Sequence, residues 1–211
     1  MVDEEVFREV LYRKVAHLQS ELERRRISNF RFADFGTRRR FSYNVQRDVV
    51  AYLTRTMPDN FIGTSNYHLA REYGLTPIGT MAHEYLQAHQ AFVNVSRSQK
   101  EALEVWNQVY RGRLGDPFVW GEKFIRHYQD FGIDPKTKTL VFSDSLDFDR
   151  ALDIAEHFQG RIQTSFGIGT FLTNDLGDFT RPDGDAYRPL NIGMKMVEWD
   201  VMPVANLSDE P

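Results

Sequence analysis

Apolar residues recur at helical spacing from the beginning of the chain. They predict one amphipathic helix over residues 3–26, with its apolar side formed by Val6, Val10, Leu11, Val15, Leu18 and Leu22. Acidic residues at positions 3–5 and arginines at positions 24–26 suit the dipole of such a helix. The arginine triplet could contact a phosphate, but a solvated helix end is the simpler interpretation.

Short apolar runs then alternate with helical patterns. Residues 30–35 predict a strand that Gly36 and Thr37 end, and Ser42 is placed to cap a helix that runs to about Met57. Further apolar runs lie around Phe61 and Pro77 and at residues 140–142 and 162–166. Small or polar residues follow each run, which predicts an α/β barrel with its function at the strand ends. An open parallel sheet is the less favoured alternative.

The C-terminal part follows a different pattern. Residues 178–188 are rich in Asp, Gly and Pro and predict an exposed loop. Residues 190–199 and 201–207 predict two strands joined by a turn near Asp200.

Composition narrows the class of protein. A chain of 211 residues with 41% hydrophobic residues can bury one sizeable core, so we expect a single partial α/β-barrel domain over residues 1–211. The net charge of −4 argues against a general nucleic-acid binder. The absence of cysteine excludes a disulfide framework and a thiol nucleophile. No apolar run is long enough to span a membrane, and we expect a cytoplasmic protein.

The segment from Gly63 to Gln90 concentrates the candidate chemistry. Two Gly-Thr pairs follow apolar runs within it, and each pair can turn the chain while exposing hydroxyl and N–H groups. His83 follows the second pair beside Glu84, and its imidazole can act as a nucleophile near neutral pH. A capping or core histidine is the alternative.

Three other segments offer polar groups at strand ends. Arg38, Arg39 and Arg40 lie at a strand-to-helix junction that suits a multiply charged anion, although three surface arginines are an equal alternative. Residues 143–147, Ser-Asp-Ser-Leu-Asp, could bind ribose hydroxyls, or Ser145 or Asp147 could simply cap the helix that runs to about residue 158. Residues 167–170, Gly-Ile-Gly-Thr, present N–H groups suited to a phosphate.

Five motifs share their order and spacing with one enzyme family. They are residues 32–41 (FADFGTRRRF), 63–66 (GTSN), 79–84 (GTMAHE), 142–147 (FSDSLD) and 166–170 (FGIGT). From about Ile27 onward the chain closely resembles bacterial nicotinate phosphoribosyltransferase. The resemblance implies an irregular α/β barrel of the type II phosphoribosyltransferase kind, here incomplete. It also implies synthesis of nicotinate mononucleotide from nicotinate and phosphoribosyl pyrophosphate, coupled to ATP hydrolysis, with Mg²⁺ and, in the intact family, a homodimer.

The resemblance also implies roles for individual residues. His83 matches the histidine that the family phosphorylates. Phe35 matches the residue that stacks on the pyridine ring, and Arg38 matches an arginine near the ring substituent and the phosphates. Residues at the ends of the last two predicted strands match the groups that hold the ribose and its 5′-phosphate: Ser143 and Asp144, then Gly167, Gly169 and Thr170. No residue is predicted as a protein ligand of a metal.

This chain departs from the family pattern at three places. The family's N-terminal domain is missing. Residues 111–117, Arg-Gly-Arg-Leu-Gly-Asp-Pro, run directly into a Gly-Asp-Pro that the family reaches through a longer segment containing a functional aspartate. Asn206 stands where relatives usually have lysine. We therefore expect a nicotinate phosphoribosyltransferase or a truncated member of that family. A fragment, a sequence with an internal segment left out, and a half that assembles with another chain fit the pattern equally. The alternative function is an inactive remnant that binds a nucleotide or an intact paralogue. A nicotinamide-using relative is less favoured, since the extra arginines suit a carboxylate substrate.

Overall fold

A computed structural model of the chain describes residues 4–79, 83–110, 121–143, 145–177, 179, 184–189 and 196–204. The chain divides into two compact units. Unit 1 contains Met1–Gly79 and Asp116–Asn191, and unit 2 contains Thr80–Gly115 and Ile192–Pro211. Each unit is described by itself, and the expectation of a single domain stays a prediction.

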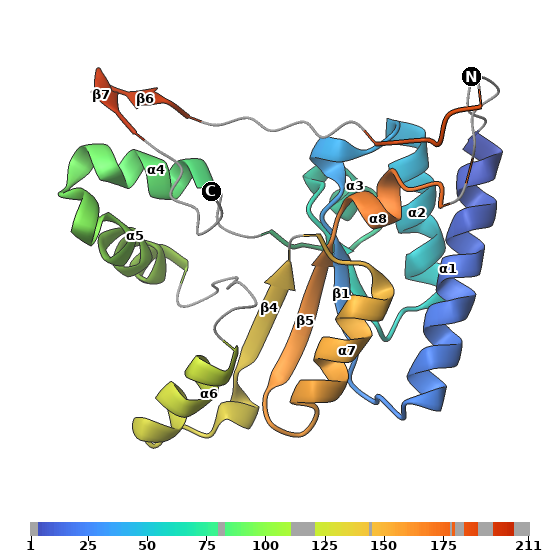
Figure 1. Ribbon diagram of the computed structural model, residues 1–211, viewed down its shortest axis with the longest axis horizontal. Helices are drawn as coiled ribbons and strands as arrows, with labels where there is room; N and C mark the ends of the chain where they lie inside the picture. Colours follow the sequence, from blue (N-terminus) through green and yellow to red (C-terminus); the bar gives the residue numbers. More distant parts are fainter. Residues whose placement is uncertain are drawn as a thin grey trace. The chain divides into compact units, whose positions relative to one another are not determined.

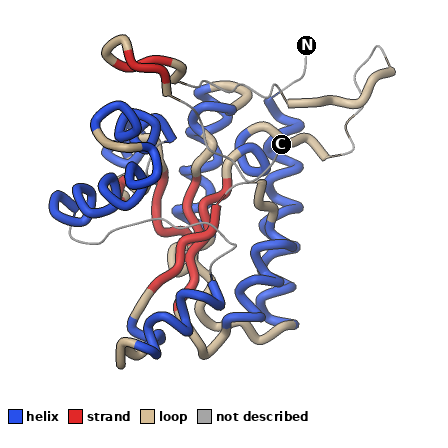
Figure 2. Tube along the Cα trace, turned by 60° about the vertical axis from the view of Figure 1, so that its left-hand side comes forward, coloured by secondary structure: helices blue, strands red, loops and turns tan. Residues whose placement is uncertain are grey.

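Unit 1 is built on a parallel sheet in which the first strand lies at the centre. The strand order is β3-β2-β1-β5-β4, and all neighbouring strands run parallel. Figure 2 shows the strands in red. The strands are β1 (Phe32–Asp34), β2 (Phe61–Thr64), β3 (Thr76–Pro77), β4 (Thr139–Ser143) and β5 (Gln163–Ile168). The predicted α/β class is confirmed. Within the described residues the sheet is open, with β3 and β4 at its edges, so it is at most part of a barrel.

Three long helices pack beside this sheet (Figure 1). They are α1 (Glu4–Arg24), α2 (Tyr43–Thr56) and α7 (Phe148–Phe158). Shorter elements complete the unit: α3 (Tyr67–Glu72), α6 (Gly121–Asp130), α8 (Thr170–Thr173) and the 3₁₀ turns η1 (Thr37–Arg39) and η3 (Pro135–Thr137). The predicted N-terminal helix and the predicted strand-to-helix repeats are confirmed to within a few residues.

Phenylalanine rings join the sheet to its helices. Phe166 on β5 stacks on Phe30 and Phe142 with ring centroids 5.1 and 5.9 Å apart. Phe32 on β1 meets Phe148 of α7 edge to face at 5.4 Å. All five rings are at least 99% buried. Such close aromatic packing makes the strand ends a rigid platform.

Polar side chains cap the first turns of α2 and α7. Ser42 caps α2 by accepting a hydrogen bond from the Val45 N–H, as predicted. Asp147, and not Ser145, caps α7, with its carboxylate accepting from the Arg150 N–H at 2.8 Å. Ser145 has a positive φ of 49° in the preceding turn.

Arg24 and Arg26 are exposed at the end of α1, as predicted, but Arg25 differs from the predicted solvated end. Arg25 is largely buried, with a side chain 14% exposed, and it bridges Glu21 to Asp153 on α7 at 2.9 and 2.6 Å. These contacts raise the pKa of Arg25, with the hydrogen bond to Asp153 as the largest cause. Arg25 is therefore a structural link between two helices, whereas Arg24 is mostly exposed and pairs only within α1.

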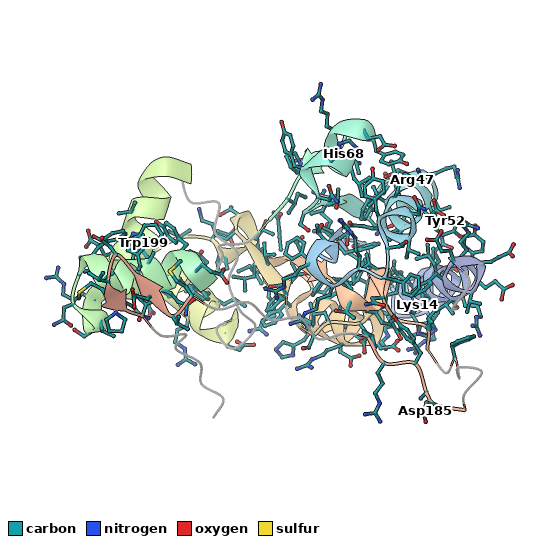
Figure 3. The ribbon with its side chains drawn as sticks, turned by 90° about the horizontal axis from the view of Figure 1, so that it is seen from above. Lys14, Arg47, Tyr52, His68, Asp185 and Trp199 are labelled. Carbon is teal, nitrogen blue, oxygen red and sulfur yellow. The ribbon has the colours of Figure 1, made fainter. Side chains whose placement is uncertain are left out.

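Unit 2 contains two helices and a short hairpin. The helices are α4 (His83–Phe92) and α5 (Val95–Tyr110), joined by a hydrogen bond from the Tyr85 hydroxyl to the Ala102 carbonyl at 2.9 Å. The antiparallel strands β6 (Glu198–Trp199) and β7 (Met202–Pro203) form the hairpin, which carries Trp199 (Figure 3). The ring centroids of Trp199 and Phe92 are 6.1 Å apart.

The turn of this hairpin lies where the sequence predicted it. Asp200 and Val201 have φ values of 47° and 57°, which is the conformation of a two-residue hairpin turn. The described strands are two residues each, shorter than predicted, and residues 190–195 and 205–207 of the predicted strands lie outside the described residues. In the described part of the chain, no helix has the length and apolar character of a membrane span.

Candidate active site

The carboxyl ends of four strands meet at one edge of the sheet. Ser143 at the end of β4 pairs in register with Gly167 of β5, which in turn pairs with Ala33 of β1. Asp34 of β1 pairs with Thr64 of β2 on the other side. The loops that follow these strands therefore start side by side, which is where ligands bind in α/β folds.

A buried carboxylate at the end of β1 organises two of these loops. Asp34 is 0% exposed. Its Oδ1 accepts the Gly36 N–H at 2.7 Å, and its Oδ2 accepts the Thr64 hydroxyl at 2.7 Å and the Gln46 amide Nε2 at 2.6 Å. Burial raises the pKa of Asp34, and the hydrogen bonds and the charge of Arg40 oppose that rise.

Gln46 of α2 continues this network towards the arginine-containing turn. Its Nε2 also donates to the Thr37 hydroxyl at 2.9 Å. Its Oε1 accepts from Arg40 Nη1 at 2.9 Å and from Asn66 Nδ2 at 3.1 Å. Gln46 is 0% exposed, so one fully buried amide connects the loops after β1 and β2.

The three consecutive arginines have three different environments. Arg38 is exposed, and no hydrogen bond or ion pair engages it among the residues that the structure describes. Arg39 has a buried Nε, and its carbonyl accepts from Asn174 Nδ2 at 2.7 Å. Arg40 is anchored on Gln46 and lies over the Tyr43 ring at 5.7 Å. Of the triplet, Arg38 is the exposed arginine, and the buried Nε of Arg39 also has no hydrogen-bond partner among the described residues.

Phe35 lies between the turn at residues 37–40 (the arginine turn) and residues 167–170 (the glycine loop). Its backbone N–H donates to the Ile168 carbonyl at 2.8 Å, and its half-buried ring lies against Gly167. A Cβ at Gly167 would be 2.3 Å from two ring carbons of Phe35. A Cβ at Gly169 would be 3.3 Å from the Phe35 carbonyl oxygen. The two glycines therefore permit close approach of the neighbouring strand, a packing role that the sequence did not predict.

Short contacts join the glycine loop to the arginine turn. The Thr173 side chain lies so close to Gly36 that a Cβ there would be 2.1 Å from the threonine hydroxyl. The Phe41 N–H donates to the Thr173 carbonyl at 3.0 Å. From α1, Lys14 donates to the Phe171 carbonyl and to the Asp175 carboxylate, both at 2.7 Å. The segment that includes Thr170 is thus held from two directions.

The predicted site residues are brought together only in part. Phe35, Arg38, Ser143, Gly167, Gly169 and Thr170 all lie in unit 1, on or just after β1, β4 and β5. Asp144 lies outside the described residues. His83 is the first described residue of α4 in unit 2, and its side chain is not among those described. Their predicted roles stay predictions.

One buried group lies a single helical turn after His83. Gln87 is 2% exposed and its Nε2 donates to the Met196 carbonyl at 3.0 Å. Its Oε1 has no hydrogen-bond partner within the described part of the chain. Helix α4 therefore buries an amide with one unsatisfied oxygen within the described residues.

Magnesium has few candidate protein ligands here. Among the described residues, no three carboxylate or imidazole groups lie close enough together to hold a metal ion.

Comparison with known proteins decides the family. A profile of the nicotinate phosphoribosyltransferase (NAPRTase) family matches residues 30–116 and 111–211. The chain belongs to this family. A nicotinate phosphoribosyltransferase from Vibrio campbellii is 51% identical, covering 98% of this chain and 55% of the relative. One from Vibrio cholerae is 47% identical, covering 96% of this chain and 54% of the relative.

Solved structures of nicotinate phosphoribosyltransferases have the same fold. The crystal structure from Vibrio cholerae has a TM-score of 0.93 at 45% identity and covers 100% of this chain and 57% of that one. The structure from Porphyromonas gingivalis has a TM-score of 0.73 at 32% identity and covers 92% of this chain and 54% of that one. This chain spans about half the length of these relatives.

The comparison also locates an internal difference. The alignment with the Vibrio campbellii enzyme is 239 positions long, 28 more than the 211 residues of this chain, so at least 28 positions of the relative have no counterpart here. The two segments matched by the NAPRTase profile overlap at residues 111–116. The sequence analysis places its internal departure from the family pattern at the same residues.

Proposed function

We propose that the chain derives from, and retains the phosphoribosyl site of, an enzyme that makes nicotinate mononucleotide from nicotinate and phosphoribosyl pyrophosphate. Its family membership supports the reaction class. The observation that carries the proposal is the packing of Phe35 against Gly167 and Gly169, with Arg38 exposed in the turn that directly follows Phe35. Aromatic, cationic and N–H groups together suit a pyridine ring joined to a phosphorylated sugar.

The proposed reaction joins the pyridine nitrogen to the sugar. That nitrogen forms a bond to the anomeric carbon of the ribose, and the bond from that carbon to pyrophosphate breaks, so pyrophosphate leaves with its electron pair. In this scheme Phe35 stacks on the ring, and Arg38 faces the nicotinate carboxylate or a phosphate. Ser143 and Asp144 hold ribose hydroxyls, while Gly167, Gly169 and Thr170 hold the 5′-phosphate. Such a reaction depends mainly on orientation and electrostatic stabilisation.

His83 is the proposed phosphoryl acceptor for ATP. A neutral imidazole nitrogen attacks the γ-phosphate and ADP leaves, and water later cleaves the phosphoimidazole. Magnesium bound to the phosphates of ATP and of phosphoribosyl pyrophosphate supplies charge neutralisation. A homodimer of the intact family remains part of this proposal.

The alternative function is an inactive module that binds a nucleotide or an intact paralogue. The internal departure at residues 111–117 favours it, because the resemblance implies a functional aspartate in the segment that this chain lacks there. Loss of one well-placed polar group commonly lowers turnover by on the order of a hundredfold. We therefore expect the 211-residue chain to turn over slowly or not at all.

The test compares the chain with a repaired version. Nicotinate mononucleotide formation is measured for the 211-residue chain and for a chain with a family-like segment inserted after Tyr110. Both are also titrated with phosphoribosyl pyrophosphate by calorimetry. Turnover that appears only after repair supports the proposal, whereas equal turnover would show that the internal difference does not disable the site. Absence of binding and of turnover in both proteins would favour the inactive module.

A further inference from the structure

The network around Asp34 buries several polar side chains that packing alone does not need. Asp34, Gln46 and Thr64 are each 0% exposed. Burying a carboxylate is costly even when it is hydrogen-bonded, and apolar side chains of similar size often give a more stable protein. A function in orientation would explain why the carboxylate is buried at this strand end.

Each oxygen atom of Asp34 holds a different part of the site. Oδ1 holds the N–H of Gly36 in the loop after β1, and Oδ2 holds the hydroxyl of Thr64 at the end of β2. The carbonyl oxygen of Asp34 accepts the Ser65 N–H at 2.7 Å, in the loop after β2. Both loops therefore depend on one residue for their position.

The amide of Gln46 can point in only one direction. Its Nε2 faces two acceptors, the Asp34 carboxylate and the Thr37 hydroxyl, and its Oε1 faces two donors, Arg40 and Asn66. Reversing the amide would place an oxygen against a carboxylate and an NH₂ group against a guanidinium. The negative charge of Asp34 thereby fixes the guanidinium of Arg40 through one intervening side chain.

We propose that Asp34 and Gln46 are positioning residues that hold the loops at 36–40 and 64–66 in one relative arrangement. Arg40 is used to complete this network, and Arg38 remains free for a phosphate-bearing ligand. The identity of that ligand rests on the proposed function, whereas the coupling of the two loops does not.

The decisive variants exchange the two functional groups. Asp34→Asn places an amide against the Gln46 NH₂ group, and Gln46→Glu places a second carboxylate against Asp34. Combining the two changes restores one carboxylate facing one amide, with the carboxylate now next to Arg40. Val49→Ala is the matched control, because Val49 is buried on the same helix and is 3% exposed. It lowers stability without changing the network.

Two measurements follow each variant. Amide hydrogen exchange reports on Gly36 and Ser65, and calorimetry reports the affinity for phosphoribosyl pyrophosphate. We expect each single substitution to accelerate amide hydrogen exchange in both loops. Each should also weaken the binding of phosphoribosyl pyrophosphate by about tenfold or more, the loss typical of one charge-assisted contact. The double variant should recover most of the exchange protection and of the affinity, and Val49→Ala should change neither quantity.

The outcomes separate this inference from the proposed function. Unchanged exchange at Ser65 in Asp34→Asn would overturn the coupling, as would a double variant that folds but recovers nothing. If Gln46→Glu does not fold, Thr64→Val must accelerate exchange at Ser65 and Asn66, and unchanged exchange there would again overturn it. If the unaltered chain does not bind phosphoribosyl pyrophosphate, the proposed function fails, and the exchange pattern alone decides the coupling.

Discussion

Gly167→Ala tests whether the position of the Phe35 ring matters for ligand binding. The added methyl carbon would lie 2.3 Å from ring atoms Cδ2 and Cε2, and ordinary contact begins at 3.4 Å, so the ring must move by about 1 Å. β5 lies between β1 and β4 in the sheet, which prevents its backbone from moving away. The ring is half-buried and can swing outward. We expect a loss of about 1–3 kcal/mol in unfolding free energy, as for other overpacked sites.

A double-mutant cycle isolates this effect. Urea unfolding and titration with nicotinate mononucleotide are measured for Gly167→Ala, Phe35→Ala and the double variant. Removing the ring removes the clash, so Gly167→Ala should cost little stability in the Phe35→Ala background, and the two changes should be strongly coupled. Ligand affinity should fall in both single variants without a further fall in the double variant. If Gly167→Ala costs the same stability with and without the ring, the proposed contact does not exist in solution.

The remaining predictions concern charge and phosphorylation. Arg38→Ala should weaken phosphoribosyl pyrophosphate binding about tenfold or more, as expected for losing a charge-assisted contact, and Arg55→Ala, on the exposed end of α2, should leave it unchanged in calorimetry. His83 should carry phosphate after incubation with Mg-ATP, and mass spectrometry under alkaline conditions should find the same signal in His83→Ala only if another residue is the acceptor. The hydrogen bond from Arg161 lowers the pKa of Glu122 from its ordinary value of 4.5 to about 2. Because the folded value is the lower one, this stabilisation is present above about pH 4.5 and is lost as the pH falls towards 2. Urea unfolding should therefore show that the free energy of unfolding falls less on acidification in Glu122→Gln than in the unaltered chain. An unchanged pH profile would contradict the contribution of the Glu122–Arg161 pair.

Local signals along the chain were sufficient to predict the strand-to-helix order. A run such as residues 140–142 followed by Ser143, or a cap such as Ser42, depends only on neighbouring residues. The position of candidate residues at strand ends was predictable for the same reason. The packing of Gly167 against Phe35 was not predictable from neighbouring residues, because Phe35 directly follows the distant strand β1.

Contacts between distant segments could not be read in this way. Asp34 meets Thr64 because β1 pairs with β2, and it meets Gln46 because of the rotation of α2 about its axis. Neither fact is encoded in a short motif. Arg25 was misjudged for the same reason, since its partner Asp153 lies 128 positions later in the sequence. A charged residue next to a Gly-Thr turn, such as Asp34, is the one local signal that could have drawn attention to the network.

The central position of β1 has a consequence for the order of folding. β1 pairs with β2 about 30 residues later, but its other edge waits for β5, since Phe32 pairs with Phe166 134 positions along the chain. During synthesis the first three strands can associate early, and β1 then presents an open edge until β5 has left the ribosome. Such long-range parallel pairing slows folding and exposes apolar strands to association. The topology that places the buried carboxylate at the middle of the sheet therefore leaves one edge of β1 unpaired in the nascent chain until β5 is made. A chaperone that shields strand edges should raise the yield of folded protein.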